Sequence, residues 1–202
     1  MLKKILCAVG VVLMMAFSNA EGADFDADFV ARIKTDADLG DAPAQYALGA
    51  CYAVVDCEGV RQDYVKAREW YEKAAAQGYA SAQYALGVTY YKGFGVRQDY
   101  VKAREWCEKA AAQGYAGAQF SLGVMYEEGH GVRQNYAKAR EWYEKAAAQG
   151  HASAQFNLGV MYSQGQGVRQ NKATAKEWFG KACDHGEQIG CDAYRALNES
   201  GY

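Results

Sequence analysis

Apolar residues recur along this 202-residue chain at the three- and four-residue spacing of amphipathic helices. One stretch contains two such stripes: Ala82, Leu86 and Tyr90, followed by Ala103, Trp106 and Ala110. A helix carries its apolar side chains on one face at this spacing, so each stripe predicts one helix that buries that face. The pattern therefore predicts pairs of helices joined by short turns.

The helix pair is repeated four times at a fixed interval. Each copy opens with Gly-Val-Arg-Gln, and the copies begin 36 residues apart, at Gly59, Gly95, Gly131 and Gly167. A period of this length is typical of a solenoid, in which each unit packs only against its neighbours. We predict an all-α solenoid with four repeats over residues 40–186.

Capping residues indicate where the second helix of each pair begins and ends. An Asp or Asn stands where free N–H groups need an acceptor, and a Gly stands where the chain leaves the helix. The expected N-caps are Asp63, Asp99, Asn135 and Asn171, and the expected glycines are Gly78, Gly114, Gly150 and Gly186. Shorter helical patterns over about 27–37 and 188–197 predict capping helices, within 21–39 and 187–202, that close the two ends of the stack.

The first twenty residues have the pattern of a cleavable signal peptide. Lys3 and Lys4 precede an apolar run from Ile5 to Phe17, and small residues stand before a cleavage point near Ala20. A run of about thirteen residues is too short for a bilayer, which needs about twenty. We therefore expect a periplasmic or secreted protein without a membrane span.

Charge and histidine content exclude several functional classes. The chain has 22 basic and 24 acidic side chains; without Lys3 and Lys4 the balance is 20 − 24 = −4, which does not favour nucleic acid. The three histidines, His130, His151 and His185, lack the spacing of metal or catalytic motifs, and no glycine-rich phosphate loop is present. We expect no catalytic residue, no metal and no cofactor.

The repeated motif resembles the Sel1-like repeat, a relative of the tetratricopeptide repeat. The pattern is A-x-x-x-L-G-x-x-Y, then G-x-G-V, D/N-x-x-K-A, W and A-A-x-x-G, over 82–114 and again over 118–150. The resemblance covers nearly all of residues 40–195. It implies a right-handed superhelix whose first helices line a concave face, and an adaptor or scaffold that binds a protein or peptide partner. We expect a monomer.

The first-helix face is the side opposite the buried stripe, and it differs between repeats. By the resemblance, the residue before Leu-Gly is often an Asn that clasps the backbone of an extended peptide, and here only Asn157 matches. The positions expected to contact a partner are Ala85, Val88, Lys92, Ser121, Val124, Glu128, Asn157, Val160 and Gln164.

Three further series recur with the period, and each has two interpretations. The tryptophans are expected to pack in the core rather than to form a ligand box. The arginines are expected to be solvated or ion-paired, with acids such as Glu69 nearby, rather than to bind an anionic polymer. The first-helix aromatics are expected to pack between repeats rather than to anchor a peptide. The series are Trp70, Trp106, Trp142 and Trp178; Arg61, Arg97, Arg133 and Arg169; and Tyr46, Tyr84, Phe120 and Phe156.

The spacing of Cys183 and Cys191 resembles the cysteine pair of the secreted, cysteine-rich branch of the family. The resemblance implies a disulfide between one repeat's second helix and the next helix, which is favoured over a metal site that includes His185. Members of that branch have been associated with binding or slowly hydrolysing β-lactams, so a penicillin-binding protein or weak β-lactamase is the alternative function. Binding of a cell-wall glycan by exposed tyrosines is a third possibility.

The remaining cysteines of the exported chain lie in the first two repeats. Cys51 and Cys57 are expected to form a disulfide that replaces a missing glycine turn, because Cys57 aligns with Gly93 of the next repeat. Cys107 stands where the other repeats have an aromatic ring, and it is expected to be buried and unpaired. Pairing of Cys107 with Cys51 or Cys57 stays open as the alternative.

Overall fold

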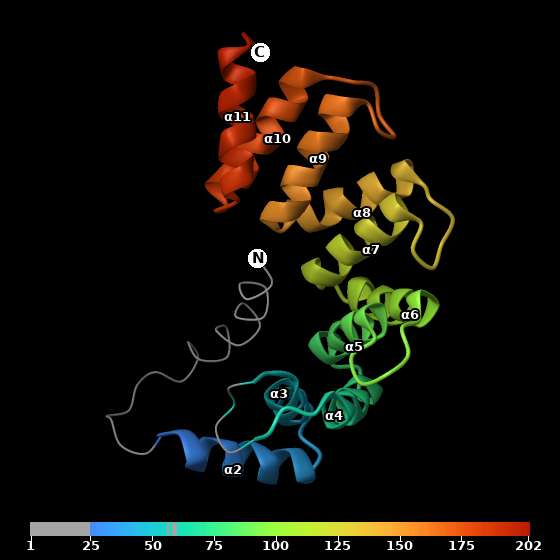
Figure 1. Ribbon diagram of the computed structural model, residues 1–202, viewed down its shortest axis with the longest axis vertical. Coiled ribbons are helices and arrows are strands. Elements are labelled where there is room, and N and C mark those ends of the chain that lie inside the picture. Colours follow the sequence, from blue (N-terminus) through green and yellow to red (C-terminus); the bar gives the residue numbers. More distant parts are fainter. Residues whose placement is uncertain (1–24, 56, 58–59) are drawn as a thin grey trace. The chain divides into compact units, whose positions relative to one another are not determined.

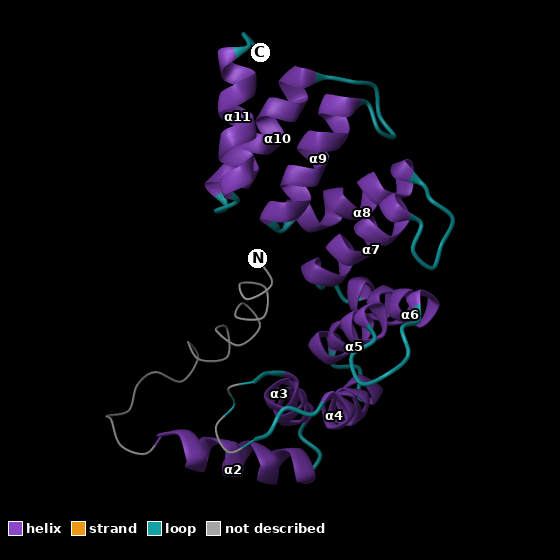
Figure 2. Cartoon of the chain, viewed as in Figure 1, coloured by secondary structure: helices purple, strands orange, loops and turns teal. Residues whose placement is uncertain are grey.

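The computed structural model describes residues 25–55, 57 and 60–202, and the predicted signal peptide lies outside this range (Figure 1). The described chain forms ten α-helices and no strand; Figure 2 shows helices joined only by loops. None of these helices combines the length and apolarity that crossing a bilayer requires. The helices are α2 (Phe25–Asp38), α3 (Ala42–Ala53), α4 (Tyr64–Ala76), α5 (Ala80–Lys92), α6 (Tyr100–Ala112), α7 (Ala116–Glu128), α8 (Tyr136–Ala148), α9 (Ala152–Gln164), α10 (Lys172–Asp184) and α11 (Gln188–Glu199). The predicted all-α solenoid is therefore confirmed.

The described helices belong to two compact units. The first extends to Ala82 and includes 94–96, and the second comprises 83–93 and 97–202. In the first unit, α3 packs against both α2 and α4. Its core contains Ile33, Ala37, Ala44, Ala47 and Leu48.

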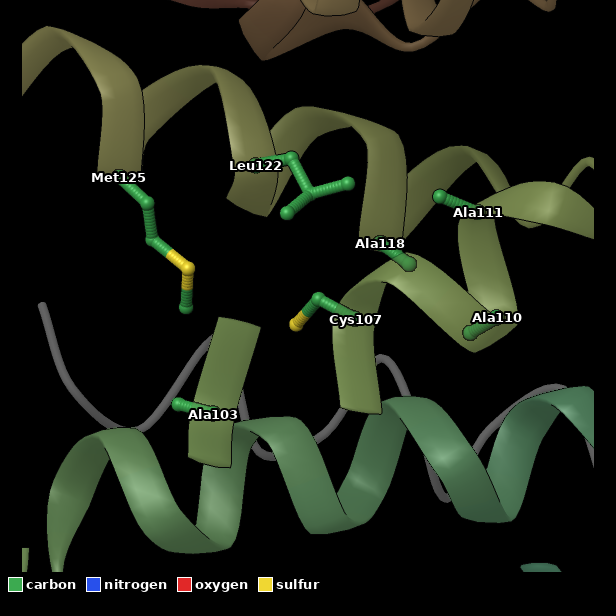
Figure 3. Packing of buried hydrophobic residues seen from close by; sticks show 7 residues of the cluster. All are labelled: Ala103, Cys107, Ala110, Ala111, Ala118, Leu122 and Met125. Atoms are coloured by element: carbon green, nitrogen blue, oxygen red, sulfur yellow. The ribbon is translucent and has the colours of Figure 1, made fainter. Parts of the chain in front are cut away.

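In the second unit, each helix from α7 to α11 packs on the helix before it. One core cluster lies between α6 and α7, where Cys107, Leu122 and Met125 are almost completely buried (Figure 3). A second cluster of the same design joins α8 and α9, with Tyr143, Leu158 and Met161 in the corresponding interior. Alanines supply most of the other buried contacts in both clusters, which lets the helices approach closely.

The glycine of each Leu-Gly pair provides the closest contact between the two helices of a repeat. A Cβ atom on Gly159 would lie 2.5 Å from the ring of Phe179, and one on Gly87 would lie 2.5 Å from Sγ of Cys107. No real Cβ is found so close to another side chain, so any other residue would push the second helix away. The repeated glycine is therefore a packing requirement.

The predicted helix caps are confirmed. Asp99 Oδ1 accepts hydrogen bonds from the N–H groups of Val101 and Lys102, and Asp63, Asn135 and Asn171 cap their helices with the same side-chain oxygen. The four glycines at the ends of these helices have φ between 81° and 88°, which L side chains rarely adopt. The period of the solenoid is therefore marked by both ends of every second helix.

One expectation about the second helix was wrong. The fully buried stripe of α6 is Ala103, Cys107 and Ala110, whereas Trp106 is only half-buried at its edge. The residue after each tryptophan, Cys107 in α6, faces the glycine of the first helix instead. The indole of Trp106 covers the edge of the core, and the Nζ of Lys109 lies 3.9 Å from the centre of its ring. At each of the other three tryptophans, a lysine Nζ lies 3.5–4.1 Å from the centre of the ring.

Candidate functional site

The nine positions expected on the first-helix face all belong to the second unit, and they differ in exposure. The last position on each helix is exposed, and the other two are half-buried. The exposed residues are Lys92, Glu128 and Gln164; the half-buried ones are Ala85, Val88, Ser121, Val124, Asn157 and Val160. Val124 also packs against the core cluster of α8 and α9, so part of this face supports the fold.

The polar side chains in the middle of the face are held by internal hydrogen bonds. Asn157 is hydrogen-bonded to the hydroxyl of Tyr143, which in turn donates to Glu127 Oε2 at 2.5 Å. Burial raises the pKa of Tyr143, and the adjacent Glu127 raises it further. Ser121 is hydrogen-bonded to the hydroxyl of Tyr84 in the same manner. Asn157 therefore has an internal hydrogen-bond partner.

A cluster at the end of α7 was missed by the sequence analysis. The hydroxyl of Tyr91 lies 2.8 Å from Nδ1 of His130 and 3.1 Å from Oε2 of Glu128, and these two atoms are themselves 2.9 Å apart. His130 stacks on Tyr100, with ring centres 4.5 Å apart. Burial raises the pKa of Tyr91, with the charge of Glu128 as the next cause. The sequence feature that could have indicated this cluster is Tyr91, because the other repeats have no aromatic residue at that position.

The first-helix aromatics pack internally, as expected. In three repeats the ring lies 5.4–5.8 Å, centre to centre, from the ring that the second helix places on the glycine. These pairs are Tyr46 with Tyr71, Phe120 with Tyr143, and Phe156 with Phe179. In the remaining repeat Cys107 replaces the second ring, and Tyr84 packs on Tyr115 at 5.0 Å. These ring contacts lie within one repeat, and Tyr84 and Phe120 also pack against the core clusters that join successive repeats.

The arginine series lies on the exposed surface of the loops. Among the described residues its members form no ion pair; the regular pairs on the second helices come from other arginines, such as Arg104 with Glu108 at 3.2 Å. Within the described chain these arginines are therefore solvated rather than ion-paired.

One of these arginines, Arg133, lines a surface groove of about 580 Å³. The groove is formed by the middle of α6, the end of α7, the following loop and the first turn of α8. We call it the basic groove; it is lined by Arg104, Tyr126, Gly131, Val132, Arg133, Gln134, Asn135 and Lys138. A related groove of about 830 Å³ lies at the corresponding place in the first unit, where Arg61, Asp63 and Lys66 line it.

The cysteine predictions are confirmed. Cys51 and Cys57 are at disulfide distance, with sulfurs 2.17 Å apart, and so are Cys183 and Cys191, at 1.98 Å. Cys107 is free and 1% exposed, and burial raises its pKa to about 12. The alternative pairing of Cys107 is therefore excluded. Two disulfides are typical of an extracytoplasmic protein.

The chain is similar to several solved structures of repeat proteins. A protective antigen of uropathogenic Escherichia coli with an SLR fold is 38% identical over 85% of this chain and 36% of its own, with a TM-score of 0.80. A Sel1 repeat protein from Oxalobacter formigenes is 35% identical over 90% of this chain and 52% of its own, with a TM-score of 0.77. The chain thus spans about a third and about half of these two structures.

A third structure is similar over nearly its whole length. Cysteine rich protein B of Helicobacter pylori is 26% identical over 65% of this chain and 94% of its own, with a TM-score of 0.52. None of the curated proteins compared with the chain matches it. The Sel1 repeat model matches residues 42–79, 80–115, 116–151 and 152–187, which follow one another through the solenoid. The chain belongs to the Sel1 repeat family.

Proposed function

We propose that this protein is an exported scaffold that binds a protein or peptide partner on the first-helix face. Sel1 repeat proteins generally act as scaffolds for protein–protein interactions. The observation that carries the proposal is the contrast between core and face in the second unit. Core residues such as Leu86, Leu122 and Leu158 are copied from repeat to repeat, whereas the exposed ends of the face differ in charge. Those ends are Lys92, Glu128 and Gln164.

This contrast supports partner binding because exposed positions are not required by packing. Beside the charged ends, half-buried valines offer apolar area, and Val88, Val124 and Val160 repeat at one place on successive first helices. A central apolar strip with a polar rim is the usual composition of a protein interface. The cluster of Tyr91, Glu128 and His130 fixes one part of that rim.

The proposal is tested by site-specific photo-crosslinking in envelope preparations. A photoreactive phenylalanine analogue replaces Glu128 or Gln164 on the face, and in a control it replaces Glu141, which is exposed on the second helix α8. We expect discrete adducts of the same mass from both face positions and none from position 141. Adducts that are equal at all three positions, or absent from the face, contradict the proposal.

Export to the periplasm or beyond the cell is the second part of the proposal, and the two disulfides support it. N-terminal sequencing of protein from the envelope fraction should give a mature chain that starts near Glu21. An intact Met1 in that fraction would contradict it.

The described residues give no support to the β-lactam alternative. Four of the cysteines there are paired, and Cys107 is buried with a raised pKa, so no reactive thiolate is available.

A further inference from the structure

The basic groove brings together three cationic side chains, of which only Arg104 is paired with an acid, Glu108 at 3.2 Å. Arg104, Arg133 and Lys138 are among the eight residues that line it, and none of the eight is acidic. Within the described chain, neither Arg133 nor Lys138 forms an ion pair. The Nζ of Lys138 instead lies 5.3 Å from the centre of the Tyr126 ring, one wall of the groove. Gathering three positive charges in one hollow is unfavourable unless an anion offsets their repulsion.

Arg104 adds an incompletely satisfied guanidinium to this charge. Its Nη1 donates to Glu108, whereas its buried Nε has no hydrogen-bond acceptor among the described residues. Arg140 has the same feature in the next repeat, but there Thr174 stands in place of Lys138. The basic groove thus has a lysine that the corresponding place in the next repeat lacks.

The N-cap of α8 makes this groove more positive than its counterpart in the first unit. Asp63 lines the first groove and caps α4 by accepting from the N–H groups of Val65 and Lys66. Asn135 lines the basic groove and caps α8 by accepting from the N–H of Lys138. Both residues cap a helix, but only the Asp brings a negative charge. A neutral cap therefore leaves Arg133 and Lys138 without an acid among the residues that line the basic groove.

We propose that the basic groove binds carboxylates of a short acidic protein segment. This surface contains none of the nine first-helix positions, so it is a second contact surface beyond the one proposed above. The chain as a whole has more acidic than basic side chains, 24 against 22, so a long polyanion would meet repulsive surface outside the groove. A short segment meets only the local charge, because salt screens charges beyond about 8 Å at physiological ionic strength.

The test measures binding of a fluorescein-labelled hexaglutamate peptide by fluorescence anisotropy, with the full mature chain and 50 mM salt. We expect Asn135→Asp, which keeps a capping oxygen, to weaken binding by about two- to fivefold, the range of one exposed charge interaction. The double variant Arg133→Gln with Lys138→Gln should weaken it by about five- to twentyfold. The control is Arg169→Gln, which removes the arginine at the same loop position of the next repeat and should leave binding unchanged.

Several outcomes would overturn the inference. Equal binding of hexaglutamine, an equal loss with Arg169→Gln, or no loss with Asn135→Asp would show that the groove does not recognise carboxylates. Competition by sodium phosphate but not by sodium acetate, at matched ionic strength, would assign the groove to phosphate instead. Circular dichroism of each variant confirms that its helices are retained, so a loss of binding reflects charge. All of these results leave crosslinking from the first-helix face unaffected.

Discussion

Replacing Gly123 by Ala should destabilise the second unit through a single added methyl group. A Cβ at this position would meet Cδ1 and Cε1 of the Tyr143 ring and would lie 3.0 Å from its Cζ. The ring is fully buried, and its hydroxyl is bonded to Glu127 and Asn157 on two other helices. It therefore cannot move aside without losing those bonds.

The expected change in the free energy of unfolding combines two destabilising effects and one stabilising effect. Overpacking a core by one methyl group costs about 1–3 kcal/mol. Ala is better than Gly inside a helix by about 1 kcal/mol, which offsets part of that cost. Displacing the Tyr143 hydroxyl would add about 1 kcal/mol for each hydrogen bond lost. We expect Gly123→Ala to lower the free energy of unfolding by about 1–3 kcal/mol.

Urea unfolding followed by circular dichroism and by tryptophan fluorescence measures this change, and the two transitions must coincide for a two-state analysis. Gly117→Ala in the same helix is the control, since its Cβ would approach only movable tyrosine rings, at 3.1 Å or more, and should change stability by less than about 1 kcal/mol. In a Tyr143→Leu background, Gly123→Ala should cost at least about 1 kcal/mol less, because the ring is gone. A Gly123→Ala protein as stable as the original would refute the argument.

Three further predictions concern buried groups and the disulfide at the C-terminus. Cys191→Ser opens a loop of about nine residues, so it should remove about 2–3 kcal/mol and increase hydrogen exchange in α11 before any other helix; unchanged exchange in α11 would contradict this. Tyr143→Phe removes both hydroxyl bonds and should cost about 1–2 kcal/mol in urea unfolding; a neutral result would show that water replaces them. Burial raises the pKa of Cys107 from 9.0 to about 12, so the folded state holds the proton more tightly and stability should fall as pH rises above about 9. Cys107→Ala should reduce that fall, although buried tyrosines retain part of it, and an identical pH profile would argue against the shift. 

Much of the fold was determined by sequence alone because its signals are local and repeated. The N-caps, such as Asp99, and the glycines that end helices act within one turn of chain, so their roles follow from position. The period of 36 residues then required each repeat to stack on the next. The pairing of Cys51 with Cys57 followed from a comparison between repeats, in which one cysteine stands where another repeat has a turn glycine.

Tertiary structure decided the contacts that depend on which side chains meet across helices. Trp106 and Cys107 are neighbours in sequence, and helical spacing allowed either to face the core. In the structure Cys107 faces Gly87 on the other helix, and the indole of Trp106 lies at the edge. In the sequence, Asn157 matches the Asn that contacts a peptide backbone in the family. In the structure its side chain is hydrogen-bonded to the hydroxyl of Tyr143. The basic groove joins Arg104 to Lys138, which are 34 residues apart, and such non-local proximity has no signature in a local pattern.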